Sequence, residues 1–525
     1  MLPGQSDDGA YVRTGTRPEA TTVAGGGLLR GKNRVTTVLA TWALLFAASL
    51  VLYWPGLCAG YFSDDLLFFF NAPPRHLFDY FATRGAAAQA YRPLEAIILT
   101  LIQQHFRFET LPIHLLSLGA HAGLCCVVLA AGRRLGLRPF ENWTACLFML
   151  VAQVGAPAVV GNDTLSQSAS AFFGGLSMLF LYFLWRDRGL ERAGPTWKRW
   201  LLLSVVAYTI SLFFKETALG FLLVALLLIG AIAFEDRAWN ARLKTAVTFS
   251  FPYGAATLFY GVARLHAGGA ISQSGSYQIH VGLNILRNLA EFSLAAFGPM
   301  STVNGAVAIA MHRTPELVLE AVGWISIVSV MLVGVAVSGR RALALWLVAA
   351  AIASLFPAYL LMHVSELYLY NAIPFLALAL AIGFGGLWHQ GLWGRLAAVS
   401  AAGLLVCGQI YADRQKAELM AQNGRRAAAI YAAIDQYLPG MPPHSRILLV
   451  NPDNRTPEYS VFLLKGFDVV DLGNLRIGPI FGRPDVQVVL IDKSEAHHLE
   501  QRKDQLLLAL APGGGVQTFK SVAMN

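Results

Sequence analysis

Long apolar segments recur through most of this chain, and they restrict its fold more than any other feature. Each runs for about 17–25 residues, long enough to cross a hydrocarbon core ~30 Å thick as a helix. Only 14% of the 525 residues are charged, against about 25% in soluble chains, so we exclude a soluble multidomain enzyme. About eleven spans are expected, near residues 36–53, 111–131, 142–160, 165–185, 199–214, 217–234, 245–265, 317–338, 342–362, 368–388 and 395–411.

The basic residues predict how these spans are oriented. The formal net charge is +9, but the Lys and Arg residues lie in short clusters between apolar runs, which is typical of membrane orientation and not of nucleic-acid binding. With the N-terminus inside, every cluster falls on the cytoplasmic side. The clusters are Arg133, Arg134 and Arg138; Arg186, Arg188, Arg192, Lys198 and Arg199; Arg237, Arg242 and Lys244; Arg340 and Arg341; and Arg395.

This orientation holds only if two further apolar segments do not cross the membrane. Residues 91–106 carry Arg92, Glu95 and His105, a composition that fits an amphipathic helix in the outer interface. Residues 283–300 are interrupted by Arg287 and Glu291 and are also expected outside. Either segment could be a true span if the other were one as well.

The composition divides the chain into three parts. Residues 1–34 are polar and Gly-rich, and we expect a disordered cytoplasmic lead, with a cleaved signal peptide as the less favoured alternative. Residues 35–411 form the transmembrane module. In residues 412–525, β-type runs at 446–450 and 486–491 and helical patterns at 413–437 and 495–510 predict a small extracytoplasmic α/β domain. The five cysteines show no disulfide or metal spacing.

Unusual polar residues gather at one membrane boundary in this topology. They come from five separate stretches, all on the outer side, whereas a random distribution would use both sides. The stretches contain Asp64 and Asp65; Arg92; Asn162 and Asp163; Lys215 and Glu216; and His363, Glu366, Tyr368 and Tyr370. The arrangement predicts a site at the outer face.

Asp64 and Asp65 are candidates for acid–base chemistry. They lie between Tyr61-Phe62 and the apolar run 66–70, and a hydrophobic interface can raise the pKa of a carboxyl group and suit it to act as a general base on a hydroxyl. The simpler alternative is a solvated turn after the first span.

The cationic candidates are suited to a phosphate. Arg92 can bind a phosphate with two nitrogens, although an interfacial arginine often only anchors its helix. Lys215 can hold a lipid phosphate with Glu216 fixing its position, or the two can form a self-neutralising pair. Asp163 can instead cap the following helix, and His363 and Glu366 can belong to an interfacial turn.

Several well-known nucleotide-binding and catalytic motifs are absent from the sequence. It has no Walker motif, dinucleotide-binding turn, His-Glu-x-x-His or Gly-x-Ser-x-Gly elbow. Carboxylates and cations at the outer leaflet therefore favour a substrate with a phosphate head and a lipid tail.

Four short motifs carry a resemblance to a known family. Ser63-Asp64-Asp65 in the first outer loop, Tyr91-Arg92-Pro93-Leu94, Phe214-Lys215-Glu216-Thr217, and the stretch 365–370 running on to Pro374 stand in this order. The arrangement over residues 36–411 resembles the GT-C superfamily of polytopic glycosyltransferases, especially the protein O-mannosyltransferase and aminoarabinose transferase branch. Leu367 stands where that family has arginine.

The resemblance implies an all-α polytopic membrane fold and an inverting transfer. A sugar would pass from a polyprenyl-phosphate-linked donor to an acceptor hydroxyl at the outer face. Asp64 would be the general base, and Asp65 would orient the acceptor or bind a divalent ion. The implied substrate and phosphate ligands are Arg92, Lys215, Glu216, Asp163, His363, Glu366 and Tyr370.

The cofactor, acceptor and alternative functions stay open at this point. A divalent cation, Mg or Mn, would use Asp64, Asp65 and Asp163. The expected acceptor is a glycan, a lipid or a protein, and no nucleic acid is expected as a partner. The protein itself is expected in an inner or plasma membrane. The alternatives are a transporter or flippase of lipid-linked glycans, a polymerase or ligase with loop 266–316, and a non-catalytic scaffold.

Overall fold

The computed structural model describes most of the chain. The described residues are 27–61, 76–82, 91–106, 109–188, 196–236, 238–268, 278–362, 364–451, 483, 485–492, 496, 505–510 and 516–518. The chain divides into two units, residues 1–41 and 42–525. The described part of the first unit is the start of helix α1.

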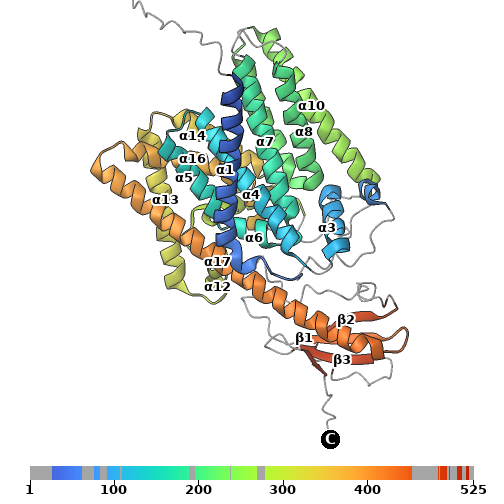
Figure 1. Ribbon diagram of the computed structural model, residues 1–525. Helices are drawn as coiled ribbons and strands as arrows, with labels where there is room; N and C mark the ends of the chain where they lie inside the picture. Colours follow the sequence, from blue (N-terminus) through green and yellow to red (C-terminus); the bar gives the residue numbers. More distant parts are fainter. Residues whose placement is uncertain are drawn as a thin grey trace, which may run out of the picture. The chain divides into compact units, whose positions relative to one another are not determined.

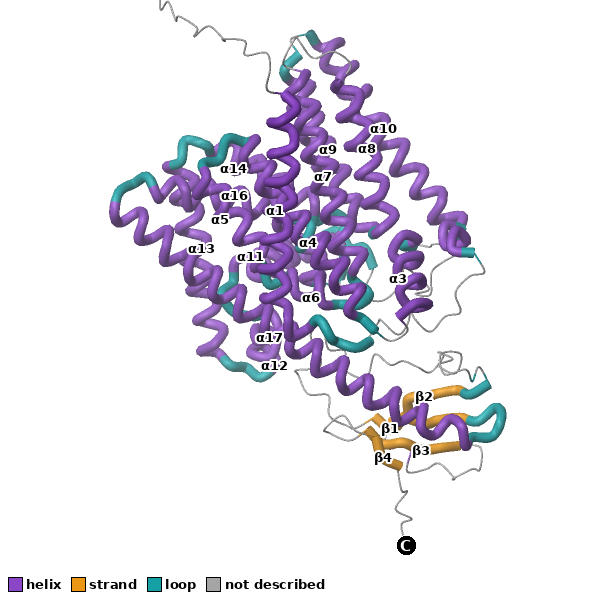
Figure 2. The backbone as a smooth tube through the Cα atoms, viewed as in Figure 1, coloured by secondary structure: helices purple, strands orange, loops and turns teal. Residues whose placement is uncertain are grey.

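The described chain is built mainly from α-helices (Figures 1 and 2). Proline lies in the first turn of several of them, where its missing N–H costs nothing and its fixed φ favours a helix. The longer helices are α1 (Gly27–Tyr53), α3 (Pro93–Phe106), α4 (Leu111–Arg134), α5 (Pro139–Val151), α7 (Leu165–Arg188), α8 (Thr196–Phe214), α9 (Leu219–Phe234), α10 (Trp239–His266), α11 (Asn284–Phe297), α13 (Thr314–Val337), α14 (Arg341–Ser354), α16 (Ile373–Trp388) and α17 (Leu392–Tyr437).

Short elements complete the described helical part. The short α-helices are α6 (Gly155–Val160), α12 (Thr302–Ala310) and α15 (Glu366–Leu369). The 3-10 turns are η1 (Trp54–Gly56), η2 (Leu77–Phe81), η3 (Glu216–Ala218), η5 (Ala358–Leu360) and η6 (Leu438–Gly440).

Within the described residues, seven helices are long and apolar enough to cross a membrane. The polytopic all-α fold predicted from the sequence is confirmed, whereas the count of eleven spans stays a prediction. The expected span 142–160 is divided between α5 and α6, and those at 342–362 and 368–388 contain helices of 14 and 16 residues. At roughly 1.5 Å per residue these helices are about 21 and 24 Å long, shorter than a hydrocarbon core.

The two segments expected not to cross are both short helices. α3 and α11 have 14 residues each, about 21 Å, so neither can span a bilayer alone. α11 exposes Leu286 and Leu294 and buries Phe292 and Phe297, so it has one face against the protein and one exposed face.

Helices α13 and α16 touch through their backbones. A Cβ atom at Gly334 would collide with the carbonyl oxygen of Gly383, and one at Gly383 would lie 2.7 Å from the Met331 oxygen. Small residues allow such close approach, which strengthens packing between helices in lipid.

Replacing Gly334 with alanine should therefore lower the free energy of unfolding by about 1–3 kcal/mol, because the new methyl group forces the two helices apart. Gly230→Ala is the matched control, since no atom lies within 4 Å of its added Cβ. That variant should be neutral or more stable by up to about 1 kcal/mol. Equal unfolding midpoints of the two variants in detergent would contradict this close contact.

A four-stranded sheet follows the helices. The strands are β1 (Arg446–Asn451), β2 (Gln487–Asp492), β3 (Gln505–Leu510) and β4 (Val516–Thr518), in the order β2-β1-β3-β4. β1 pairs in parallel with β2 and β3, and β4 is antiparallel to β3. The two predicted β-type runs form β1 and β2.

The helix predicted over residues 495–510 is wrong at its end. Residues 505–510 form β3, and Leu507 and Leu508 are buried. A short continuous apolar run fits a strand of a parallel sheet as well as a helix, and pairing with β1 decides the outcome.

Helix α17 continues without a break past residue 411, where the last span was expected to end (Figure 1). It has 46 residues, and Asp413, Lys416 and Met420 are buried. Ala417 and Met420 belong to the same hydrophobic core as the other helices. The expected boundary between residues 411 and 412 therefore lies inside one helix.

Candidate active site

Three of the predicted site residues, Asp64, Asp65 and His363, lie outside the described residues. The other six, Arg92, Asp163, Lys215, Glu216, Glu366 and Tyr370, are described. They form two groups, which we call the Arg92 cluster and the Lys416 network.

The Arg92 cluster begins at the start of α3. Pro93 opens this helix and leaves Arg92 directly before it, with a side chain only 14% exposed. The Arg92 guanidinium donates from Nε to Glu216 Oε2 at 3.3 Å and from a terminal nitrogen to Glu216 Oε1 at 3.2 Å. The sequence prediction that these two distant positions share one site is consistent with this two-bond pair.

Glu95, on the next turn of α3, was not among the predicted site residues. One carboxylate oxygen accepts a hydrogen bond from the Ser166 backbone N–H at 2.6 Å, at the start of α7, and the other lies 3.8 Å from Arg92. A carboxylate is favoured at the positive end of a helix. Its i, i+3 spacing from Arg92 is the sequence signal that would have identified it.

Asp163 precedes α7 and is half-buried. Its charge acts on Arg92, Glu95 and Lys215, so it belongs to the electrostatic surroundings of the cluster. Thr164, the next residue, directs its hydroxyl to the carbonyls of Pro157 and Gly161. The turn before α7 is thereby fixed, with Asp163 beside the cations.

Lys215 is the most unusual member of the cluster. It lies in the extended turn between α8 and η3 and is 2% exposed. Within the described part of the chain its ammonium forms no hydrogen bond and no ion pair, although it feels the charges of Arg92, Glu216, Glu95 and Asp163. A buried ammonium without a direct partner carries a large desolvation cost.

The titration of the cluster follows from burial and crowding. Burial, and then Arg92, lower the pKa of the Lys215 ammonium below its ordinary value. Burial raises the pKa of the Glu95 carboxyl, against the opposing effect of Arg92. Burial alone would lower the pKa of Arg92, but Glu216 and Glu95 raise it above its ordinary value. Added negative charge near Lys215 would favour its protonated form.

Glu366 and Tyr370 belong to the second group, the Lys416 network, around α15. Glu366 Oε2 accepts hydrogen bonds from Lys416 Nζ and from the Thr302 hydroxyl, both at 2.6 Å. Lys416 also donates to Gln153 Oε1 at 2.9 Å. Glu366 is 2% exposed and Lys416 is fully buried, so this ion pair holds α15 against α17.

The sequence interpretation missed Lys416, Asp413 and Gln409, although the pattern contains a signal for them. Buried residues recur along α17 at 398, 401, 405, 409, 413, 416 and 420, which is helical spacing for one face. The polar residues from Gln409 onward continue the buried stripe that begins with alanine and leucine. Their positions on the same face of the helix as the buried apolar residues, and not their polarity, indicate that they face the protein.

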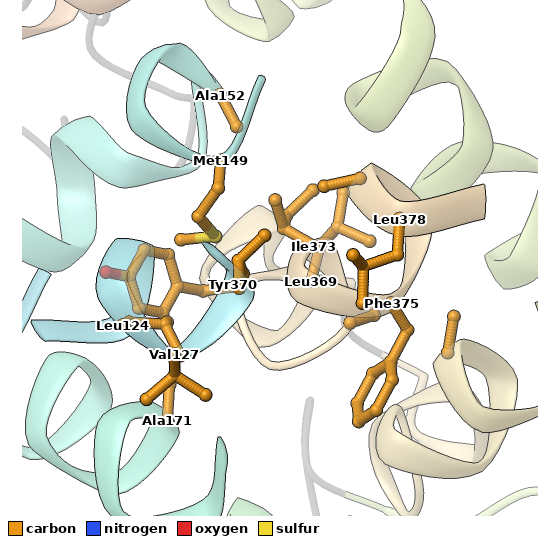
Figure 3. Close-up of a cluster of buried hydrophobic side chains, with 14 of the residues drawn as sticks. Leu124, Val127, Met149, Ala152, Ala171, Leu369, Tyr370, Ile373, Phe375 and Leu378 are labelled. Atoms are coloured by element: carbon orange, nitrogen blue, oxygen red, sulfur yellow. The ribbon is translucent and has the colours of Figure 1, made fainter. Parts of the chain in front are cut away.

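Tyr370 lies inside the protein, among Leu124, Val127 and Met149 (Figure 3). A hydrogen bond of 2.7 Å joins its hydroxyl to His121 Nδ1, and His121 Nε2 lies 3.2 Å from the Leu150 carbonyl. Tyr370 is fully buried, and its described contacts are structural.

Asn371 connects the two groups. Its amide nitrogen donates to the Thr217 carbonyl at 3.3 Å, in the turn that carries Lys215 and Glu216. Its amide oxygen accepts from Gln167 at 2.7 Å, near the start of α7. Asn371 lies two residues after α15, so the segment held by Lys416 also contacts the 215–217 turn and the beginning of α7, two of the three segments that form the Arg92 cluster.

Among the described residues, no group of three or more His, Cys, Asp or Glu side chains is arranged so that it could hold a metal ion. Asp64 and Asp65 lie outside those residues, so the divalent cation stays a prediction. An apolar cavity of ≈ 260 Å³ lies between α4, α7, α9, α14 and α16. Its lining includes Phe221, Leu228, Trp346, Pro374 and Phe375.

No protein-family model matches the chain, and no curated protein matches it. Among solved structures, ArnT from Cupriavidus metallidurans in the apo state is similar, with 13% identity and a TM-score of 0.48 over 90% of this chain and 93% of that one. The same protein bound to undecaprenyl phosphate has 12% identity and a TM-score of 0.45 over 89% and 93%.

Proposed function

We propose that the chain is an inverting membrane glycosyltransferase that moves a sugar from a polyprenyl-phosphate donor to an acceptor hydroxyl at the outer face of the membrane. The buried Lys215 ammonium, without a direct ion-pair partner in the described residues, is the observation that carries this proposal. An anionic group bound beside it would offset its desolvation cost. A phosphate fits this requirement, and Arg92 adds a second cation nearby.

The apolar cavity supports a lipid-linked donor. Phe221 is six positions after Lys215, and Pro374 and Phe375 follow Asn371, whose amide contacts the Thr217 carbonyl. Some of the cavity lining therefore comes from chain segments that follow those of the Arg92 cluster, and the cavity lies between apolar helices. A phosphate at Lys215 with an isoprenoid chain in the cavity would use both features.

The proposed chemistry is a single displacement at the sugar's anomeric carbon. The acceptor oxygen attacks that carbon while its proton passes to Asp64, and the bond from the carbon to the phosphate oxygen breaks with its electron pair. Arg92 and Lys215 stabilise the negative charge that develops on the departing phosphate. Glu216 and Glu95 hold the Arg92 guanidinium in place.

Replacing Lys215 with glutamine should lower kcat/KM for donor consumption on the order of 10²-fold, because the leaving phosphate loses one stabilising charge. The measurement uses membranes with wild type or variant and a panel of labelled polyprenyl-phosphate sugars, and follows release of polyprenyl phosphate.

Arg287→Gln is the control for this experiment, since Arg287 is 79% exposed and paired with Glu291 on α11. It should transfer sugar at the wild-type rate. Full activity of well-folded Lys215→Gln would contradict the phosphate role of Lys215. A wild type that consumes no donor in the panel would favour the transporter alternative.

A further inference from the structure

A second group of basic side chains lies in other parts of the sequence, where several helices begin or end. Arg138 precedes α5, Arg340 precedes α14, and His389 and Arg395 flank the connection between α16 and α17. Contacts between neighbouring residues hold these chain segments together: Arg340 donates to the Gly136 carbonyl at 2.9 Å, and the Phe140 and Trp388 rings stack with their centroids 4.5 Å apart. We call Arg138, His389, Arg395, Phe140 and Trp388 the Arg138 patch.

No carboxylate of the described residues forms an ion pair with Arg138 or Arg395 of the patch. The Arg138 guanidinium donates to Nε2 of His389. The Glu141 carboxylate forms an ion pair with Arg340 at 3.1 Å and accepts a hydrogen bond from the Arg138 backbone N–H at 2.8 Å. Arg395 bonds the Trp388 carbonyl and lies over its ring. In the described chain, neither Arg138 nor Arg395 has an acidic partner.

The start of α5 and of α17 strengthens the positive field. Both helices begin at the patch, and a helix N-terminus carries partial positive charge. An anion held at this point would meet two guanidinium groups together.

Exposed apolar side chains extend from the patch along both helices. On α5 they are Phe140, Trp143 and Leu147, which are 42%, 45% and 43% exposed at helical spacing. On α17 they are Leu392, Trp393, Leu396 and Val399. A free phosphate ion would make no contact with these apolar strips, whereas the acyl chains of a phospholipid would cover them.

We propose that the Arg138 patch binds an anionic phospholipid. The lipid phosphate accepts hydrogen bonds from the Arg138 and Arg395 guanidinium groups, and its acyl chains lie along the exposed strips of α5 and α17. The orientation predicted from the basic clusters places this site in the cytoplasmic leaflet, which is rich in anionic lipid. The site is separate from the proposed donor site and does not depend on the proposed function.

Lipid binding to the purified full-length protein in detergent tests this proposal. Native mass spectrometry with equal amounts of phosphatidylglycerol and phosphatidylethanolamine should show preferential binding of phosphatidylglycerol. The Arg138→Gln/Arg395→Gln variant should lose affinity for it on the order of tenfold, because two phosphate ligands are removed. Arg287→Gln removes one exposed cation on α11 and should bind like wild type.

Three results would overturn the proposal: equal retention of the two lipids, an unchanged affinity in the double variant, or displacement of the lipid by millimolar inorganic phosphate, which would indicate a site for the free ion. Arg138 is the N-cap residue of α5, so replacing it could disturb the start of that helix. Arg395→Gln is therefore also measured alone. It should fold normally and lose affinity in the same direction by a smaller factor.

Discussion

Replacing Lys416 with methionine should lower the free energy of unfolding by about 3–5 kcal/mol. The ammonium lies 2.6 Å from Glu366 Oε2, and both side chains are at most 2% exposed. Without it, the Glu366 carboxylate stays buried with the Thr302 hydroxyl as its remaining described hydrogen-bond donor. Unfolding of the purified protein, followed as denaturing detergent is added to mixed micelles, measures the loss.

Two further variants separate the ion pair from a general effect of losing a lysine. Lys198→Met makes the same substitution at an exposed position of α8 and should change stability by no more than about 0.5 kcal/mol. Glu366→Gln combined with Lys416→Met removes both charges and should recover a large part of the loss. If the double variant is as unstable as the sum of the two single variants, the residues are not coupled.

Replacing Asp64 with asparagine should lower the rate of sugar transfer on the order of 10²–10⁴-fold. The carboxamide keeps the shape of the side chain but cannot accept the acceptor's proton. The measurement is transfer of labelled sugar from polyprenyl-phosphate donors in membranes, with the amount of protein determined in parallel.

Asp435→Asn provides the same chemical change at an exposed position of α17 and should leave transfer unchanged. Normal transfer by Asp64→Asn would show that Asp64 is not the base, and Asp65→Asn would be the next variant to measure. If binding of donor is also lost, the carboxylate acts before the chemical step, and the assignment as base is wrong.

Four members of the Arg92 cluster, Arg92, Asp163, Lys215 and Glu216, could be singled out from the sequence because each interrupts an apolar environment, whereas Glu95 was not predicted. Arg92 and Glu216 are 124 positions apart and are joined by two hydrogen bonds, as expected from their shared boundary. Glu366 was expected in the same site but pairs with Lys416 instead. A boundary fixes the depth of a residue in the membrane and not its direction around the bundle, so the pattern could not separate the two groups.

The fold could be predicted where the length of an apolar run determines the structure, and less well where packing against distant residues determines it. Runs of about 20 apolar residues have one stable form in lipid, and the long helices follow. The break at residues 152–154 between α5 and α6 depends on Gln153, which bonds to Gln409, Thr302 and Lys416. These partners are more than 140 positions away, so no local pattern reveals the break. The β3 strand likewise depends on pairing with β1.

The continuity of α17 determines where this protein can be divided. At roughly 1.5 Å per residue its 46 residues extend for about 69 Å, well beyond the thickness of a hydrocarbon core. A truncation after residue 411, the boundary suggested by hydropathy, would remove Lys416 and Met420 and leave the Glu366 carboxylate buried without its cation. A stable shortened protein must therefore keep the helix beyond Met420, and a separately expressed C-terminal segment should begin after that residue so that it does not carry these core-facing side chains into water.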